Sequence, residues 1–356
     1  GRLTCIFIYY VQALLSFLLI MSSSYIIDKL QSSTTTEAPA HIFEFDKQII
    51  NLEFSPYLWS HDLICIAFID KLRVAAIKFQ EENDGQIEEV EYTKLQDFPC
   101  NSRVHSISWS PEANIRSAPK CILFACSMEN YKINVYNSKL TNSDQEILPS
   151  KVVCGHVNYV NDIAYNTTGE YLASASDDLT CRIWLVMNNY EEMRKFYLRS
   201  PGVAVKWHQN NSGQVMVGEK YGSVLFYNVT TGNAIMSLRS QASPLLSLDW
   251  SPSDSSYVSA MCGGNLVIWY IPNPSSPFYE QLVHPEGGFH VKFLPLSEQK
   301  LVSLGAPDNT LKLFSTTKRY PQTITTLKLA HGLTCHHHLP YICVGVDNLM
   351  YIWNIS

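Results

Sequence analysis

Three side chains near the middle of the sequence have the types that a serine hydrolase uses. His156, Ser174 and Asp178 supply an imidazole, a hydroxyl and a carboxylate, the groups that activate a serine nucleophile. The sequence lacks the glycine-rich, Walker, HExxH and GxSxG motifs that accompany common active sites. Each of the three side chains also fits a structural role, with the hydroxyl buried in a sheet. We therefore predict no catalytic residue, no bound cofactor and no enzymatic activity.

A second cluster has the side chains of a metal site. It consists of His331, Cys335, His336, His337 and His338. On a β-strand, Cys335 and His337 would share one face, while His336 and His338 would share the other. A tetrahedral zinc site needs ligands that converge from separate elements. We therefore predict a strand of mixed burial and no metal ion.

The composition excludes several classes of protein. The chain has 356 residues, of which 46% are hydrophobic and 16% charged, and its net charge is −6. The sequence has no dense run of basic residues, and Arg194-Lys195 and Lys318-Arg319 are only pairs, which argues against direct binding of nucleic acid. The ten cysteines are irregularly spaced without a CxxC motif, a pattern that favours reduced thiols in the cytosol or nucleus.

Two sequence markers recur in phase along the chain. The first is an alternating apolar segment that ends, unit by unit, at Phe54, Trp109, Tyr165, Trp207, Trp250, Phe293 and His337. The second is an alternating segment that ends at Phe79, Tyr136, Trp184, Tyr227, Trp269, Phe314 and Trp353. Alternation with a period of two is typical of strands. Most of the spacings are about 40–45 residues, the period of a four-stranded propeller blade. We therefore predict seven blades.

The wider spacings in the first part of the chain predict two insertions. One is the acidic segment 80–97 and the other is the loop 111–120. For segment 80–97 we expect a solvated hairpin, with a docking surface for a basic partner as the alternative. Because loops carry many partner contacts, both insertions are candidates for docking.

The third unit resembles a WD repeat. It opens with Gly155-His156 and ends at Trp184. In that family a buried hydrogen-bonded network links four residues of a blade. The resemblance implies that His156, Ser174, Asp178 and Trp184 form this network here, as structural residues. Other units keep only parts of it: the turn acids Asp308 and Asp347, and the indoles Trp269 and Trp353.

The two ends of the chain indicate how the ring closes. The last unit ends on its third strand, with Trp353 close to the final residue. Residues 41–45 alternate like a strand and precede the first unit. We predict that they complete the last blade, because a closed ring leaves only short protected sheet edges. The expected fold is an all-β, seven-bladed WD-repeat β-propeller over residues 41–356, with the N-terminal strand closing the last blade.

The residues before the propeller allow three interpretations. Segment 5–21 is almost entirely apolar, so it could be a signal peptide, a short membrane anchor or an extension that is not part of the natural protein. We favour the third, with Met21 as the start, for residues 1–21. Residues 22–40, rich in Ser, Thr, Ala and Pro, are expected to form a flexible lead-in. We predict no stable insertion in a membrane.

Several segments are not general WD features and are similar to the small WD-repeat nucleoporins of the Y-shaped scaffold complex of the nuclear pore. They include residues 198–208, which contain Ser-Pro-Gly and end in Trp-His, and the turn at residues 218–222. The resemblance implies a scaffold subunit at the nuclear envelope. Its partners would be the large nucleoporin of the complex's long arm and other subunits of the complex, with kinetochore association in some animals. It implies no small-molecule substrate.

Two other classes of protein remain open. A WD-repeat reader of histone tails or other short peptides would need an aromatic cage or acidic ring at one mouth of the channel. A secreted or membrane-tethered propeller would carry glycans, for example at Asn228 or Asn354.

Overall fold

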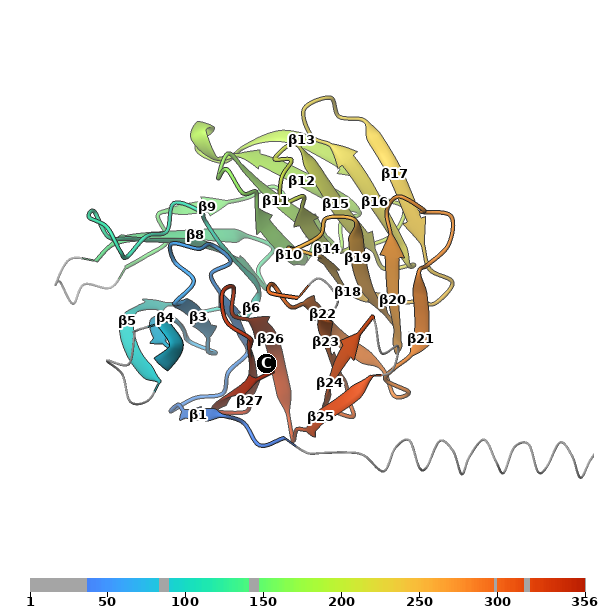
Figure 1. Ribbon diagram of the computed structural model, residues 1–356. Coiled ribbons are helices and arrows are strands. Elements are labelled where there is room, and N and C mark those ends of the chain that lie inside the picture. Colours follow the sequence, from blue (N-terminus) through green and yellow to red (C-terminus); the bar gives the residue numbers. More distant parts are fainter. Residues whose placement is uncertain (1–36, 83–89, 141–146, 298–299, 317–320, 356) are drawn as a thin grey trace, which may run out of the picture.

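The computed structural model describes residues 37–82, 90–140, 147–297, 300–316 and 321–355. In these residues, seven four-stranded antiparallel sheets are arranged as blades around a central channel (Figure 1). We number them in chain order, from blade 1 (strands β2 to β5) to blade 7 (strands β26 to β28, with β1). The predicted seven-bladed propeller is confirmed.

Each blade runs from an inner strand at the channel to an outer strand at the rim. The inner strands are β2 (Asn51–Phe54), β6 (Val104–Trp109), β10 (Val160–Tyr165), β14 (Gly202–Trp207), β18 (Leu245–Trp250), β22 (Gly288–Phe293) and β26 (Ala330–Cys335). The second strands are β3 (Leu63–Ala67), β7 (Cys121–Met128), β11 (Tyr171–Ser176), β15 (Gln214–Glu219), β19 (Tyr257–Cys262), β23 (Lys300–Gly305) and β27 (Tyr341–Val346). The third strands are β4 (Lys71–Lys78), β8 (Ile133–Lys139), β12 (Thr180–Leu185), β16 (Ser223–Asn228), β20 (Asn265–Tyr270), β24 (Thr310–Ser315) and β28 (Leu349–Asn354).

The outer strands are β5 (Glu91–Pro99), β9 (Lys151–Val153), β13 (Glu191–Tyr197), β17 (Ala234–Arg239), β21 (Tyr279–Leu282), β25 (Gln322–Thr326) and β1 (His41–Glu44). Two short 3₁₀ helices, η1 (Gln80–Glu82) and η2 (Val186–Asn188), lie in the connections. Among the described residues, no helix is long and apolar enough to span a membrane. The apolar segment 5–21 lies outside the described residues.

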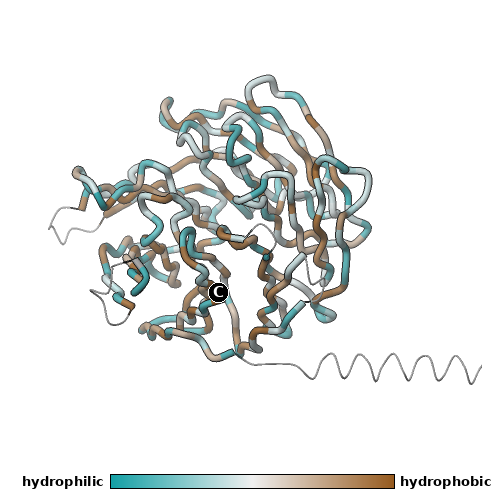
Figure 2. The backbone as a smooth tube through the Cα atoms, in the orientation of Figure 1, coloured by the Kyte–Doolittle hydropathy of each residue, from teal (hydrophilic) through white to brown (hydrophobic). Residues whose placement is uncertain are grey.

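The hydrophobic core lies between the blades. Seven apolar clusters occur, one at each interface between neighbouring sheets, including the interface of blade 7 with blade 1. The aromatic residues of the first marker end the inner strands and are buried there, as Phe54 and Trp109 illustrate. Burying one such side chain contributes about 1.5–3 kcal/mol. Figure 2 shows apolar residues along the strands and many hydrophilic residues in the connecting loops.

Polar side chains on the inner strands tie neighbouring blades together. The carboxylate of Asp162 on β10 accepts the Val205 N–H of β14 at 3.0 Å. The hydroxyl of Thr334 on β26 accepts the Phe54 N–H of β2 at 3.0 Å. Because a buried backbone N–H needs a partner, these bonds fix the alignment of one blade against the next around the ring.

The N-terminal strand closes the ring, as predicted. Strand β1 pairs antiparallel with β28, with His41 opposite Ile352. The bonding begins earlier in the chain: the Glu37 N–H donates to the Ile324 oxygen at 2.9 Å, and the Glu37 oxygen accepts the Trp353 indole N–H at 3.1 Å. The last residues of the expected lead-in at 22–40 are therefore held by blades 6 and 7, whereas residues 22–36 lie outside the described residues.

The structure corrects two predicted positions. Cys335, not His337, ends the inner strand of blade 7. The next residue, His336, donates its N–H to the Tyr341 oxygen, as Ser110 after Trp109 donates to the Leu123 oxygen in blade 2. The expected insertion at residues 80–97 is in part the outer strand β5 of blade 1, which pairs with β4 along its whole length. The wide early spacing therefore reflects long strands as well as loops, and residues 83–89 lie outside the described residues.

Candidate functional site

The structure brings the four residues of the predicted WD network together in blade 3. His156 lies before β10 and its Nδ1 is 2.8 Å from Asp178 Oδ2, while its Nε2 is 2.7 Å from Ser174 Oγ. The Trp184 indole N–H donates to the same hydroxyl at 2.9 Å. Thr180, which the sequence analysis did not include, donates its hydroxyl proton to Asp178 Oδ1 at 2.5 Å.

This arrangement is unsuited to a nucleophile. The Ser174 side chain is fully buried on the second strand of the sheet, and its oxygen already has the His156 and Trp184 partners. Burial opposes ionisation of Asp178, but hydrogen bonds from His156 and Thr180 outweigh it and hold the pKa of the carboxyl well below its ordinary value. The carboxylate therefore acts as a fixed acceptor that holds the imidazole and the turn before β12.

A second His-Ser-Asp group occurs in blade 6. His284 Nε2 is 2.9 Å from Ser303 Oγ, and its Nδ1 is 3.1 Å from Thr310 Oγ1 and 3.5 Å from Asp308 Oδ2. Burial and repulsion by Lys312 lower the pKa of His284 to about 4. The sequence analysis identified Asp308 but missed His284, because Val283 precedes it where a WD repeat has glycine. The signal was a threonine two residues after the acid, as in blade 3.

The side chains of the histidine-rich segment after β26 lie in different surroundings. His336 is buried against Phe54 and Phe79, and its Nε2 is 3.3 Å from His61 Nδ1. The neighbouring His337 lines the central channel instead. The predicted strand through residue 338 was wrong, since β26 ends at Cys335. No group of three or more metal-ligating side chains forms within the part of the chain that the structure describes.

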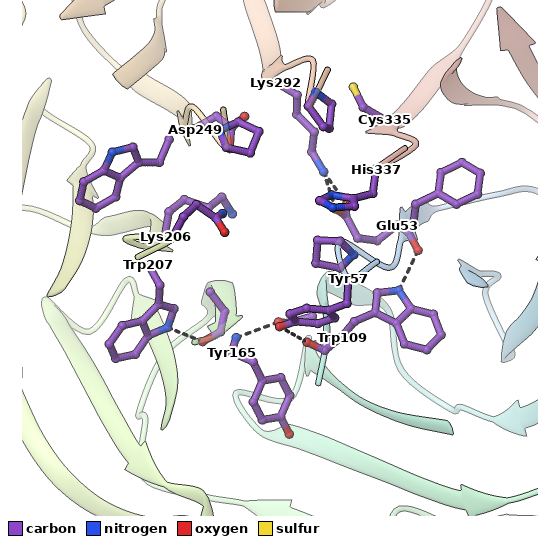
Figure 3. Close-up of a pocket in the computed structure, with 18 of the residues that line it drawn as sticks. Glu53, Tyr57, Trp109, Tyr165, Lys206, Trp207, Asp249, Lys292, Cys335 and His337 are labelled. Carbon is purple, nitrogen blue, oxygen red and sulfur yellow. Dashed lines mark hydrogen bonds and ion pairs between the residues drawn. The ribbon is translucent and has the colours of Figure 1, made fainter. Parts of the chain in front are cut away.

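A cavity of about 270 Å³ lies where the inner strands end, at one mouth of the central channel. Residues from all seven blades line it. Figure 3 shows Tyr57, Trp109, Tyr165 and Trp207 around this space. Pro56, Pro252 and Pro295, which follow the inner strands of blades 1, 5 and 6, also contribute. The tryptophan rings are buried between the blades, with Trp109 and Trp207 only 1% and 5% exposed, so they do not form the open aromatic cage that a peptide reader would need.

Charged side chains are also directed into this cavity. Lys292 Nζ lies 2.5 Å from Glu53 Oε1, which joins blade 6 to blade 1 (Figure 3). Lys206 Nζ lies 2.8 Å from Asp162 Oδ2. Burial disfavours the ammonium of Lys206, but attraction by Asp162 outweighs it, so the pKa of this lysine is raised. Both lysines are therefore held as partners of carboxylates.

Asp249 differs from the other two carboxylates in its partners. Its Oδ2 accepts the Phe293 N–H at 2.7 Å, and it forms no ion pair with any residue that the structure describes. Burial raises the pKa of its carboxyl to about 6, although Lys292 and Lys206 act in the opposite direction. The sequence analysis did not identify Lys206, Asp249 or Lys292. Each immediately precedes the aromatic residue that ends its inner strand, so the first marker locates them.

Comparison with known proteins identifies the family. The sequence pattern of the WD domain, G-beta repeat, matches residues 148–184, which hold the complete network of blade 3. Nucleoporin Nup37 of Drosophila melanogaster is 30% identical over 322 residues, covering 89% of this chain and 98% of the fly protein. The chain belongs to the nucleoporin Nup37 family. The Nup37 proteins of mouse and human are 32% and 31% identical, with 97% and 96% of their lengths covered.

The Nup37 match confirms the resemblance to the small WD-repeat nucleoporins. It extends over nearly the whole length of these Nup37 relatives, whereas the repeat pattern matches one repeat, from the outer strand of blade 2 to the third strand of blade 3. The similarity to Nup37 therefore includes the blades that lack a recognisable WD signature as well as blade 3. The chain is a WD-repeat β-propeller of a nucleoporin family.

Proposed function

We propose that the chain is a non-enzymatic scaffold subunit of the nuclear pore complex. The observation that carries the proposal is the similarity to Nup37 proteins over 88–89% of the chain. The fold supports it, because seven blades with a cluster of apolar residues at every interface form a preformed surface. Such a surface loses little conformational entropy when it binds a partner.

The partner in this proposal is a larger nucleoporin of the long arm of the Y-shaped complex. We propose docking through the face that carries the loop 111–120. Beside this loop, Leu58 and Trp59 are 55% and 43% exposed, and the Trp59 indole N–H donates to the Pro111 oxygen at 2.8 Å. Exposed tryptophan held by a hydrogen bond is a common anchor of protein interfaces.

Affinity purification of the tagged chain from nuclei, followed by mass spectrometry, tests the scaffold role. Recovery of the subunits of the Y-shaped complex is expected, and an unrelated set of proteins would overturn the proposal. The same purification from mitotic cells tests the kinetochore association that the resemblance implies.

Variants test the docking face separately. The double substitution Leu58→Ser and Trp59→Ser is expected to reduce recovery of the large nucleoporin at least tenfold. Met187→Ser provides a matched control, because Met187 is 83% exposed in η2 of blade 3. Equal recovery with both variants would contradict docking through this face while leaving the scaffold role in place.

A further inference from the structure

Two segments that are not general WD features, residues 198–208 and the turn at residues 218–222, lie side by side in blade 4. The Tyr221 N–H of the turn donates to the buried Ser200 hydroxyl at 3.2 Å. The Lys220 N–H donates to a backbone oxygen of the same loop at 2.9 Å. The loop before β14 and the turn after β15 therefore form one hydrogen-bonded unit.

A buried carboxylate fixes the backbone of this loop. Glu219, the last residue of β15, is only 2% exposed. Its Oε1 accepts the Arg199 N–H at 2.5 Å and the Ser200 N–H at 3.4 Å. Because a buried carboxylate is unfavourable unless it is hydrogen-bonded, these bonds hold the loop in place. The carboxylate binds the backbone of Arg199, and the side chain of this arginine stays exposed.

Three exposed basic side chains meet at this unit. Arg199 lies in the loop, Lys220 in the turn and Arg239 at the end of β17. The residue after Arg239, Ser240, donates its N–H to the turn at 2.9 Å. None of the three basic side chains forms an ion pair with another residue that the structure describes. Together with Tyr221, they form a surface that we call the basic surface of blade 4.

Two carboxylates reach the neighbourhood of the basic surface. Glu280 of blade 5 accepts a bond from the Ser240 hydroxyl at 3.4 Å. The half-buried Asp177 accepts the Asn161 amide at 2.7 Å, and this amide also donates to the Gly202 oxygen at the start of β14. Three cations still outnumber two carboxylates, on a chain whose net charge is −6. The surface is therefore suited to an anionic partner.

The number of cations indicates which kind of anion fits. Nucleic acid is typically held by about 6–10 phosphate contacts, and anionic membranes by clusters of about 4–8 basic residues. Three cations are too few for either, and the negative net charge repels a long polyanion. A short acidic segment matches them, because a guanidinium binds a carboxylate through two parallel hydrogen bonds. Tyr221, which is 70% exposed, adds an apolar ring and a polar hydroxyl beside the charges.

We propose that the basic surface of blade 4 binds an acidic segment of a partner protein, in which two or more Asp or Glu side chains are closely spaced. The carboxylates meet Arg199, Lys220 and Arg239, and the ring of Tyr221 packs against the apolar part of the segment. Because hydrogen bonds already hold the loop and the turn, binding orders little of the backbone.

The basic surface and the proposed docking face are on opposite sides of the propeller. Strand β14 begins at Gly202, beside the basic surface, and ends at Trp207, in the lining of the channel-mouth cavity. Trp59 of the docking face follows β2, which ends at Phe54 in the lining of the same cavity. The two surfaces can therefore be occupied at the same time, and failure of one proposal leaves the other in place.

Fluorescence anisotropy of the purified full chain with labelled peptides tests the proposal. The probes are fluorescein-Gly-Ser-Glu-Asp-Glu-Ser-Gly-amide and a neutral analogue in which Gln-Asn-Gln replaces Glu-Asp-Glu. The acidic peptide is expected to bind saturably at low salt and at least tenfold more tightly than the neutral one. The two peptides have nearly the same shape, so this comparison isolates the charge and requires no protein variant.

Two double variants locate the binding site. Arg199→Gln with Lys220→Gln removes two of the three cations and keeps the backbone N–H groups that hold the loop. It is expected to weaken binding of the acidic peptide at least tenfold. Arg103→Gln with Lys132→Gln removes the same charge from exposed positions on the same face of blade 2 and is expected to leave binding nearly unchanged.

Three results would overturn the proposal. Equal weakening by both double variants would show that only the net charge of the chain matters. Equal binding of the acidic and neutral peptides, or no saturable binding, would exclude recognition of carboxylates. A labelled single-stranded DNA of thymidines tests the other class of partner: if it binds more tightly than the acidic peptide and displaces it, the basic surface is a nucleic-acid site.

Discussion

Blades 3 and 6 both contain a hydrogen-bonded network of histidine, serine and aspartate. The network is complete in blade 3 and lacks one member in blade 6. In blade 3 the Ser174 hydroxyl joins His156 to the Trp184 indole, and the Asp178 side chain is 2% exposed. In blade 6 the third-strand aromatic is Phe314, which has no N–H to donate, and the Asp308 side chain is 17% exposed. Blade 6 therefore keeps the histidine, hydroxyl and acid contacts but lacks the link to the third strand.

The comparison shows that the histidine, serine and acid can be in contact in a blade whose sequence does not match the WD pattern. The WD pattern matches blade 3. Ser303 and Asp308 of blade 6 are five residues apart, whereas Ser174 and Asp178 are four apart. The imidazole of His284 nevertheless reaches both the serine and the acid. A turn that changes its length by one residue disrupts a motif more than it disrupts the hydrogen bonds.

Removing the acid of each blade gives the largest expected contrast. In Asp178→Ala, donors on His156, Val157 and Thr180 lose their acceptor. We expect the free energy of unfolding to fall by about 3–5 kcal/mol. Asp308→Ala is expected to cost about 1–2 kcal/mol, because Asp308 is more exposed and its contact with His284 is longer. Urea unfolding of the two variants measures both values, and equal losses would contradict the comparison.

The two blades are also expected to lose stability in different pH ranges. Folded His284 has a pKa of about 4, below its ordinary value of 6.5. Between these values the unfolded chain takes up a proton that the folded chain does not, so stability falls as the pH drops from about 6.5 to 4. The pKa of Asp178 is also lowered, but for an acid the stabilisation is present above its ordinary value of 3.8 and is lost below it.

Replacing His284 measures its share of this effect. The stability of the wild type relative to His284→Gln is expected to fall by about 2–3 kcal/mol between pH 7 and pH 4. Thermal unfolding over a series of pH values provides the measurement. A difference that does not change with pH in this range would show that His284 is not held neutral by its surroundings.

The architecture of the ring was predictable because it depends on repetition. The buried aromatic residues and the alternation fixed seven units, and the strand around Phe43 was assigned to blade 7 because the last unit lacked a fourth strand. The end of the inner strand in blade 7 was not predictable. Cys335 and His337 have the same place in the alternation and blade 7 has a cysteine where the other inner strands end on an aromatic residue, so the aromatic marker could not locate this strand end.

Some polar residues of the sites were likewise predictable from the sequence, and others were not. His156 and Ser174 were predictable because blade 3 keeps the full pattern, while His284 was hidden by the loss of one glycine. The first marker locates the charged residues of the channel mouth, but which of them pair was not predictable. Lys292 of blade 6 pairs with Glu53 of blade 1, and a contact between residues so distant in the chain follows only from closure of the ring.

Serine-to-alanine substitutions refine the comparison of the two blades. Ser174→Ala leaves both His156 Nε2 and the Trp184 indole without a partner, so a cost of about 2 kcal/mol is expected. Ser303→Ala removes the partner of His284 alone, and about 1 kcal/mol is expected. In a Trp184→Phe background, the cost of Ser174→Ala should fall to that of Ser303→Ala. If the background makes no difference, the indole bond contributes nothing to stability.

In blade 7 the third-strand tryptophan has a different partner from that in blade 3. Its replacement has the smallest expected effect on stability. The Trp353 indole donates to the backbone oxygen of Glu37, which precedes the propeller in the chain. The cost of Trp353→Phe therefore includes about 1 kcal/mol for the lost bond. In a chain that begins at His41, strand β1 is kept and the acceptor is absent, so Trp353→Phe should cost about 1 kcal/mol less. Chemical denaturation of the four proteins in this cycle measures the coupling. A coupling of zero would show that residues 37–40 lie beside blade 7 without stabilising it, and that the first stabilising contact of the ring closure is β1 itself.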